Sequence, residues 1–184
     1  SYEASLKANN KYLMRHAFVD AGVPCPQFFC VTQCEDSLEN QISAIHSVMH
    51  LPLIVKPSDR SGSLGVTKVN AWEQLAPAIE QALSLSFKHE AMVEEFIDGK
   101  EISVEYISYN GTHYPLQITD KVTTGAPHFV ELEHHQPSAL PKDICDEVHR
   151  ITQKALTALG ISAFSVSFSP LTTTSKVRSK LLGA

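Results

Sequence analysis

The segment from Leu51 to Val66, LPLIVKPSDRSGSLGV, constrains the fold more than any other part of the chain. It opens with a short apolar run, which is typical of a buried strand, and this run ends at Lys56. Small and polar residues follow, and the chain becomes apolar again in GVTKV, residues 65–69. The pattern predicts two paired strands joined by a flexible loop, with a lysine at the end of the first strand.

The loop after Lys56 has a structural and a chemical interpretation. In the structural one it is a plain hairpin loop, and the long lysine side chain carries its charge to solvent. In the chemical one, Gly62 and Gly65 let backbone N–H groups approach the oxygens of an anion closely. Ser61 and Ser63 then add hydroxyl donors, and Lys56 adds a positive charge. The loop matches neither of the standard glycine-rich phosphate motifs, so both interpretations stay open.

Composition argues against several classes of protein. The chain has 184 residues, 43% of them hydrophobic, which suffices for one or two compact units with a core. Its formal net charge of −5 argues against a nucleic-acid partner, because such binding needs a basic surface. No apolar run reaches the roughly 18 residues of a membrane-spanning helix, so we expect no membrane contact. Four cysteines without a CxxC pair, and a start unlike a signal peptide, favour reduced thiols and a cytoplasmic location.

Hydrophobic periodicity predicts helices that flank short, mostly antiparallel strands, and therefore an α+β fold in two small lobes. Asn110-Gly111 between two alternating runs is a strong hairpin signal. We place the first lobe at residues 1–90 and the second at 91–184. Helices are predicted at residues 9–21, 35–49, 70–85 and 141–160, and strands at 28–31, 51–55, 65–69, 91–97, 101–108, 113–122 and 161–168.

The segment VEEFIDGKE, residues 93–101, also has two interpretations. Glu94 and Glu95 are neighbours on a predicted strand, so their side chains point to opposite faces and one of them faces inward. The segment is either a half-buried edge strand or a hinge between two lobes. As a hinge it would offer backbone groups to an adenine edge, and Glu101 to the two hydroxyls of a ribose.

Four segments in this order resemble the ATP-grasp superfamily: NKYLMRHAFVDAGVPCPQF, LPLIVKPSDRSGSLGV, VEEFIDGKEISVE and ITDKVTTGAPHFVE. They extend over about residues 10–160, and the nearest branches are the carbamoyl-phosphate-synthase-like and the L-amino-acid-ligase-like ones. The resemblance implies an α+β ATP-grasp fold in which two lobes, each with antiparallel strands and helices, clamp ATP.

The resemblance implies phosphate contacts at three matching places. Lys11 opens the first helix and Lys56 precedes the loop, and both occupy positions of phosphate-binding lysines. Lys121, in the segment TDK, would be a further lysine of this kind. The loop residues that would close over the phosphates are Ser61, Gly62, Ser63 and Gly65.

The remaining implied contacts concern adenine, ribose and the acceptor substrate. The main chain of the hinge strand would read adenine, and an acid beyond it would hold the ribose. The segment HFVELEHHQP, residues 128–137, would lie near the acceptor. The residues concerned are Glu94, Glu95, Phe96 and Ile97 for the hinge, Glu101 for the ribose, and Glu131 and His134 for the acceptor.

The implied chemistry is ATP-dependent ligation of a small-molecule carboxylate to an amine or a thiol through an acylphosphate. Two alternatives stay open: a carbamoyl-phosphate-synthase- or biotin-carboxylase-type reaction on carbonate, and a non-catalytic nucleotide-binding module. Members of the superfamily often dimerise, which leaves a homodimer open for this chain.

The end of the chain departs from the superfamily pattern. The resemblance implies Mg²⁺ held by carboxylates after the last helix, yet no Asp or Glu follows Glu147, and Arg178 stands without them. We therefore expect the Mg²⁺ ligands outside this chain and interpret it as a piece of a larger ligase, inactive alone. A divergent or frame-shifted tail is the alternative.

Overall fold

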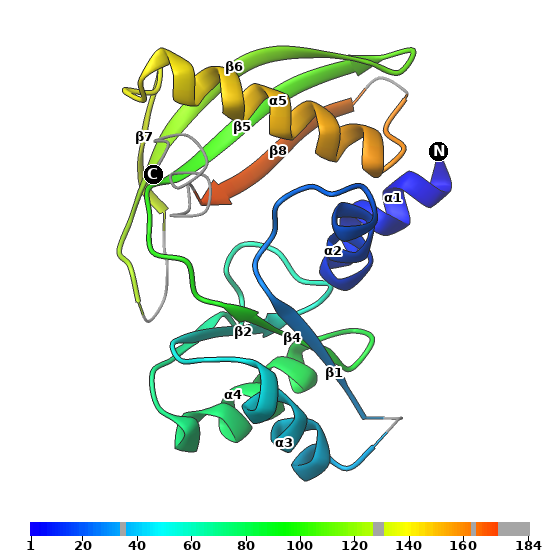
Figure 1. Ribbon diagram of the computed structural model, residues 1–184, viewed down its shortest axis with the longest axis vertical. Coiled ribbons are helices and arrows are strands. Elements are labelled where there is room, and N and C mark those ends of the chain that lie inside the picture. The colour runs from blue at the N-terminus through cyan, green and yellow to red at the C-terminus, as the bar shows by residue number, and fades with distance from the viewer. Residues whose placement is uncertain (34–35, 127–130, 163–164, 173–184) are drawn as a thin grey trace.

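The computed structural model describes residues 1–33, 36–126 and 131–162, and the course of the backbone at 165–172 (Figure 1). Two lobes are present, each with a four-stranded antiparallel sheet and helices. The predicted α+β fold in two lobes is confirmed. No helix in these ranges is both long and apolar enough to cross a membrane.

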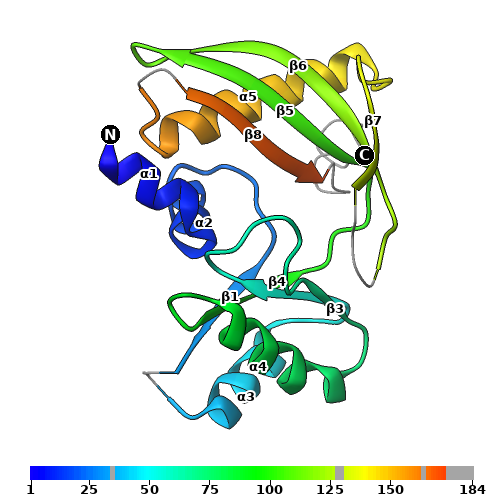
Figure 2. The same cartoon turned by 180° about the vertical axis from the view of Figure 1, so that it is seen from behind.

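The first lobe is a sheet in the order β1-β4-β2-β3 with two helices on one face. Helices α3 and α4 lie on the face turned away from the second lobe (Figures 1 and 2). Its strands are β1 (Phe28–Thr32), β2 (Leu53–Pro57), β3 (Thr67–Val69) and β4 (Glu90–Glu95), and its helices are α3 (Leu38–Val48), η1 (Trp72–Gln74) and α4 (Leu75–Leu85).

Alternation along β2 decides where Lys56 points. Leu53 and Val55 are fully buried among the apolar side chains of α3 and α4. Lys56 lies between Val55 and the buried Pro57, so it projects from the opposite face of the strand. That face is the one turned toward the second lobe (Figure 1).

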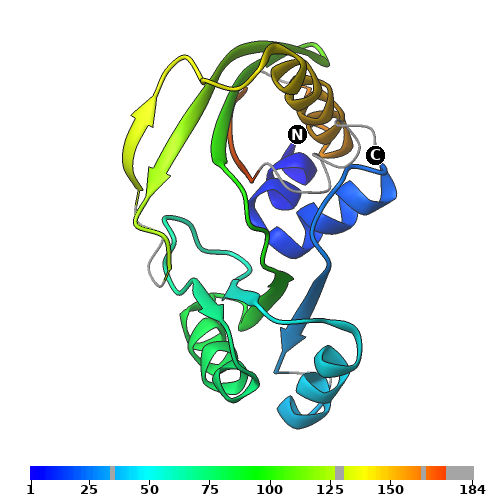
Figure 3. The same ribbon diagram turned by 60° about the vertical axis from the view of Figure 1, so that its left-hand side comes forward.

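The second lobe is a sheet in the order β7-β6-β5-β8, with α5 lying across one face (Figure 3). Buried residues alternate along β5, and these pack with α5 into a second core. The predicted hairpin is present, because Asn110 and Gly111 both have positive φ, 49° and 77°, between β5 and β6. The elements are β5 (Glu101–Tyr109), β6 (Thr112–Thr123), β7 (Glu131–His135), α5 (Lys142–Ala158) and β8 (Ser165–Thr172).

Two N-terminal helices, α1 (Tyr2–Asn9) and α2 (Lys11–Asp20), lie between the lobes (Figure 1). Phe18 of α2 packs with Ile151 and Leu159 of the α5 region. At the other end of α2, the Lys11 amide donates to the carbonyl of Ser58 at 2.8 Å, next to β2. Helix α2 therefore contacts both lobes. Helix α1 was not predicted from the sequence.

The proposed division at residue 90 stays a prediction. Strand β4 begins at Glu90 and pairs with β1 and β2 in the first sheet. The connection to the second lobe consists of residues 96–100, between β4 and β5.

Candidate functional site

A buried carboxylate, Glu94, organises the first group of candidate residues. It lies on β4, and its side chain is 5% exposed. Its Oε2 pairs with the Nζ of Lys56 from the neighbouring strand β2. Its Oε1 accepts a hydrogen bond of 2.8 Å from the Nε of Arg15 on α2. Three elements thus bring two cations to one anion at the face of the sheet turned toward the second lobe.

These two cations keep Glu94 ionised. Burial raises the pKa of this carboxyl, but the charges of Lys56 and Arg15 outweigh it and lower the pKa to about 2. Burial lowers the pKa of Lys56, and the attraction of Glu94 opposes that effect. Ionic pairing, and not solvent, therefore stabilises the charged forms of these side chains.

Lys11 lies beside this group at the start of α2. Its Nζ donates to the carbonyl of Ser58, at 3.5 Å, and to that of Arg60. Burial, and then repulsion by Lys56, lower the pKa of Lys11 to about 8. The predicted phosphate lysines 11 and 56 are therefore neighbours, and an anion placed between them would relieve their repulsion.

The loop between β2 and β3 has a fixed base and an exposed tip. Asp59 accepts hydrogen bonds from the amides of Phe87 and Lys88, at 3.3 and 3.0 Å, and Arg60 stacks over the Phe87 ring. The tip, residues 61–64, is exposed and rises on the side facing the second lobe (Figure 1). An exposed tip on an anchored base is the expected form of a loop that covers a ligand.

Glycine is favoured at position 65, where the loop returns to β3. Its φ is +71°, and a Cβ there would lie 2.6 Å from Leu85 Cδ1 and 3.2 Å from the Pro57 ring. Gly62 also has a positive φ, +65°, but a Cβ there would meet no atom within 4 Å.

The predicted hinge, at the end of β4, is held by backbone hydrogen bonds to the residues just before β1 and β2. The Glu95 amide donates to Gln27 O at 2.9 Å, and the Phe96 amide donates to Pro52 O at 3.1 Å. The Phe96 ring lies under Lys68, whose Nζ is 3.6 Å from the ring centroid. Ile97 follows directly, at the start of the connection between the lobes.

The second lobe brings the other candidates together around Lys121. This side chain is 7% exposed, and its Nζ contacts Glu101 at 2.8 Å and Glu131 at 2.5 Å. Burial lowers the pKa of Lys121, but the two carboxylates outweigh this effect and raise it. The other carboxylate oxygen of Glu131 lies 3.1 Å from His134 Nε2. Residues from β5, β6 and β7 thus meet at one edge of the second sheet.

A family model described as "D-ala D-ala ligase C-terminus" matches residues 17–166. The chain belongs to this family. The curated D-alanine–D-alanine ligase of Methylibium petroleiphilum is 31% identical over 164 residues, which are 85% of this chain and 50% of that protein. The chain spans about half the length of the curated relatives it matches.

Solved structures share the fold of this D-ala D-ala ligase family member. The VanG D-Ala:D-Ser ligase of Enterococcus faecalis has a TM-score of 0.81 at 20% identity, over 93% of this chain and 50% of that one. The Bacillus anthracis D-alanine–D-alanine ligase complexed with ATP has a TM-score of 0.70 at 20% identity, over 94% and 55%. The predicted resemblance to the ATP-grasp superfamily is confirmed.

Sequence reasoning missed residues that support the lysines. Arg15 follows Lys11 by one helical turn, so the two share a face of α2, and this spacing was a usable signal. Buried Asn10 and Ser58 form a polar group with the partly buried Glu90, whose Oε2 accepts from both of them at 2.9 Å. These three come from distant parts of the chain, so no local pattern marks them.

The magnesium that the resemblance implies has no site of three ligating side chains in the part of the chain that the structure describes. Within 1–33, 36–126 and 131–162, no three His, Cys, Asp or Glu side chains are arranged to hold a metal ion. That the Mg²⁺ ligands lie outside this chain stays a prediction. Arg178, and residues 128–130 of the acceptor segment, lie outside the described residues.

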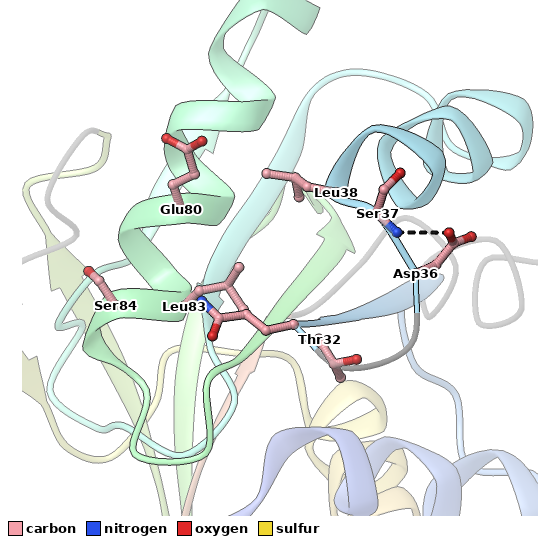
Figure 4. A pocket seen from close by; sticks show the side chains of 8 residues that line it. Thr32, Asp36, Ser37, Leu38, Glu80, Leu83 and Ser84 are labelled. Atoms are coloured by element: carbon pink, nitrogen blue, oxygen red, sulfur yellow. Dashed lines mark hydrogen bonds between the residues drawn. The ribbon is translucent and has the colours of Figure 1, made fainter.

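A cavity of about 430 Å³ lies elsewhere in the first lobe (Figure 4). It opens between the end of β1, the start of α3 and one face of α4, where Ser37 donates its amide to Asp36 at 2.7 Å. None of the predicted site residues lines it. Its lining residues are Thr32, Gln33, Asp36, Ser37, Leu38, Glu80, Leu83 and Ser84.

Proposed function

We propose that this chain is the ATP-binding part of a ligase that joins a carboxylate to an amine through an acylphosphate. The observation that carries the proposal is the meeting of Lys11 and Lys56 at the fixed base of an exposed, glycine-containing loop. Both lysines are partly buried and repel each other, an arrangement that favours a bound polyanion. The names of the relatives, and a neighbour complexed with ATP, support the same assignment.

In this proposal the nucleotide spans the two lobes. Its phosphates contact Lys11, Lys56 and the loop from Ser61 to Gly65. Adenine lies along the end of β4 at Glu95 and Ile97, with Glu94 and Phe96 beside it. In the second lobe, Glu101 accepts from the ribose hydroxyls. Lys121, now shared between two carboxylates, turns to phosphate.

The reaction proceeds in two displacements. An oxygen of the substrate carboxylate attacks the γ-phosphorus, the bond to the β,γ-bridging oxygen breaks, and ADP leaves. The amine then attacks the acyl carbon, loses a proton, and inorganic phosphate leaves. The lysines hold the phosphates in line and offset the negative charge on the transferred group.

We further propose that the carboxylate belongs to an amino acid and not to carbonate. The matching family and the relatives are named for joining alanine to alanine or serine. Glu131 and His134 are exposed on the edge strand β7, where Glu131 already pairs with Lys121. They are the candidates for contacting the acceptor amino acid.

Titration calorimetry with MgATP tests the proposal. We expect the wild-type chain to bind, and Lys56→Ala to weaken binding by about tenfold or more through loss of a charge-assisted contact. Lys142→Ala is the matched control, because Lys142 pairs with Asp146 on the exposed surface of α5 and should leave affinity unchanged. Circular dichroism would show that each variant is folded, and Lys11→Gln provides a second site variant.

Two results would overturn this assignment. One is a wild-type chain that does not bind ATP at millimolar concentration. The other is equal affinity of folded Lys56→Ala, Lys11→Gln and wild type. The substrate class is tested separately by binding, because we expect no turnover by this chain alone: calorimetry of the ATP-loaded chain compares D-alanine with bicarbonate. Binding of bicarbonate alone would favour the carbonate branch.

A further inference from the structure

Arg15 is the one cation of the first group that the nucleotide proposal does not use. It lies on α2, its side chain is 18% exposed, and its guanidinium approaches both oxygens of Glu94. The Nε–Oε1 distance is 2.8 Å and the Nη2–Oε2 distance is 3.5 Å. Lys56 pairs with the same Oε2. One buried carboxylate is therefore shared between two cations from different elements.

This sharing bears on how Lys56 can leave Glu94. A lysine that turns toward a phosphate withdraws its charge from the carboxylate that it was paired with. A buried carboxylate left without a partner is strongly unfavourable. Arg15 removes that obstacle, because Glu94 keeps a hydrogen-bonded cation on Oε1 after Lys56 has moved away from Oε2.

The position of Arg15 is set independently of Lys56. The N-terminus of α2 is capped by Asn10, which accepts from the Leu13 amide at 2.9 Å. Further along α2, Phe18 packs with Ile151 in the core shared with α5. Arg15 is therefore held on a helix fastened at both ends, whereas Lys56 lies at the end of a strand that leads into the exposed loop.

We propose that Arg15 is a positioning residue that holds Glu94 and thereby leaves Lys56 exchangeable between this carboxylate and the phosphate chain of a nucleotide. The inference rests on the nucleotide site proposed above. It assigns to Arg15 no contact with the nucleotide itself. Replacing Arg15 should therefore weaken only the part of the nucleotide affinity that comes from contact between Lys56 and the phosphates.

The test compares ATP with AMP, which lacks the outer phosphates, on the full chain in magnesium buffer. We expect Arg15→Gln to weaken ATP binding by about tenfold and AMP binding by less than about twofold. Arg15→Lys keeps the charge and should recover most of the ATP affinity. Arg150→Gln is the matched control. Arg150 is exposed on α5 and pairs there with Glu147, so this substitution should change neither affinity.

A second background separates positioning from direct attraction of phosphate. In Glu94→Gln no carboxylate retains Lys56, so adding Arg15→Gln should leave ATP affinity unchanged within about twofold. The double variant leaves Lys56 as the remaining cation without its carboxylate partner, so circular dichroism must show that it is folded before its affinity is compared. Persistence of the tenfold loss in this background would show that Arg15 attracts phosphate directly and would overturn the inference.

Other outcomes are equally decisive. An equal loss for ATP and AMP in Arg15→Gln would mean a purely structural role and would reject the inference. If ATP binds wild type and is lost in Lys56→Ala while Arg15→Gln is neutral, the nucleotide site stands and only the role of Arg15 fails. If wild type does not bind ATP, both fail together.

Discussion

Asn10 and Glu90 lie 80 residues apart, and the Nδ2 of Asn10 donates to the Oε2 of Glu90 at 2.9 Å. The same Asn10 side chain accepts from the Leu13 amide through its other atom, Oδ1. One residue therefore begins α2 and fastens it to β4. Since Lys11 follows directly, the position of this lysine, which we propose to contact phosphate, depends on this contact.

Asn10→Ala should lower the free energy of unfolding by about 1–3 kcal/mol, because it removes a helix cap and a partner of a partly buried carboxylate. Urea denaturation measures the change. Asn9→Ala is the control: Asn9 makes one exposed hydrogen bond, to Ser5 O, and should cost less than about 0.5 kcal/mol. Equal losses in the two variants would contradict the role given to Asn10.

The pKa of about 2 for Glu94 predicts acid sensitivity. A carboxyl whose pKa is lower in the folded state stabilises the fold above its ordinary pKa of 4.5, and this stabilisation is lost as the pH falls toward 2. Unfolding measured at several pH values in this window should show that the free energy of unfolding decreases as the pH is lowered. Glu94→Gln in combination with Lys56→Met should flatten that dependence, and an unchanged slope would count against the pairing.

His113 predicts a second loss of stability on acidification, which begins at a higher pH than the loss caused by Glu94. It is buried beneath α5, with Ser108 Oγ at 2.7 Å from Nδ1 and Thr157 Oγ1 at 3.2 Å from Nε2. Burial lowers its pKa below the ordinary 6.5. The neutral ring is therefore favoured by folding, and stability is complete above pH 6.5 and declines as the pH falls below it.

Unfolding at pH 7.5 and 5.5 would measure this effect. His113→Gln should be less stable at pH 7.5 and should lose less between the two values. His50 is exposed, so His50→Gln should behave like wild type. An identical decline in the free energy of unfolding in all three proteins would argue that other groups are responsible.

Gly65→Ala should destabilise the chain by about 1–3 kcal/mol, since its Cβ would lie 2.6 Å from Leu85 and its φ is +71°. Gly62→Ala shares the positive φ without the contact, so about 1 kcal/mol is expected. The difference between the two midpoints in urea isolates the packing contribution. A larger effect at Gly62 would contradict the geometry.

Local patterns were enough to place Lys56. The apolar run before it predicts a strand, and the change to small residues predicts a loop. The adjacent residues therefore suffice to predict that β2 ends near this lysine. The turn at Asn110-Gly111 was equally accessible, because two residues that tolerate positive φ determine it.

The partners of Lys56 were not accessible in the same way. Glu94 is 38 residues away from it and Arg15 is 79 residues away from Glu94, so only the folded chain brings these charges together. The resemblance gave Glu94 a place beside adenine but no ionic partner. Nothing in the local sequence shows that one carboxylate serves two cations.

Helix α2 is fastened to the first sheet at one end and rests on α5 along its apolar side. Any opening or closing of the two lobes must therefore turn this helix about its capped end or release the cap. Such a rotation would change the backbone angles in the two short connections that follow α2 and β4, residues 21–27 and 96–100. Lys11 lies at the pivot and would barely shift, and the ion pair between Arg15 and Glu94 holds the next turn of α2 to the first lobe as well.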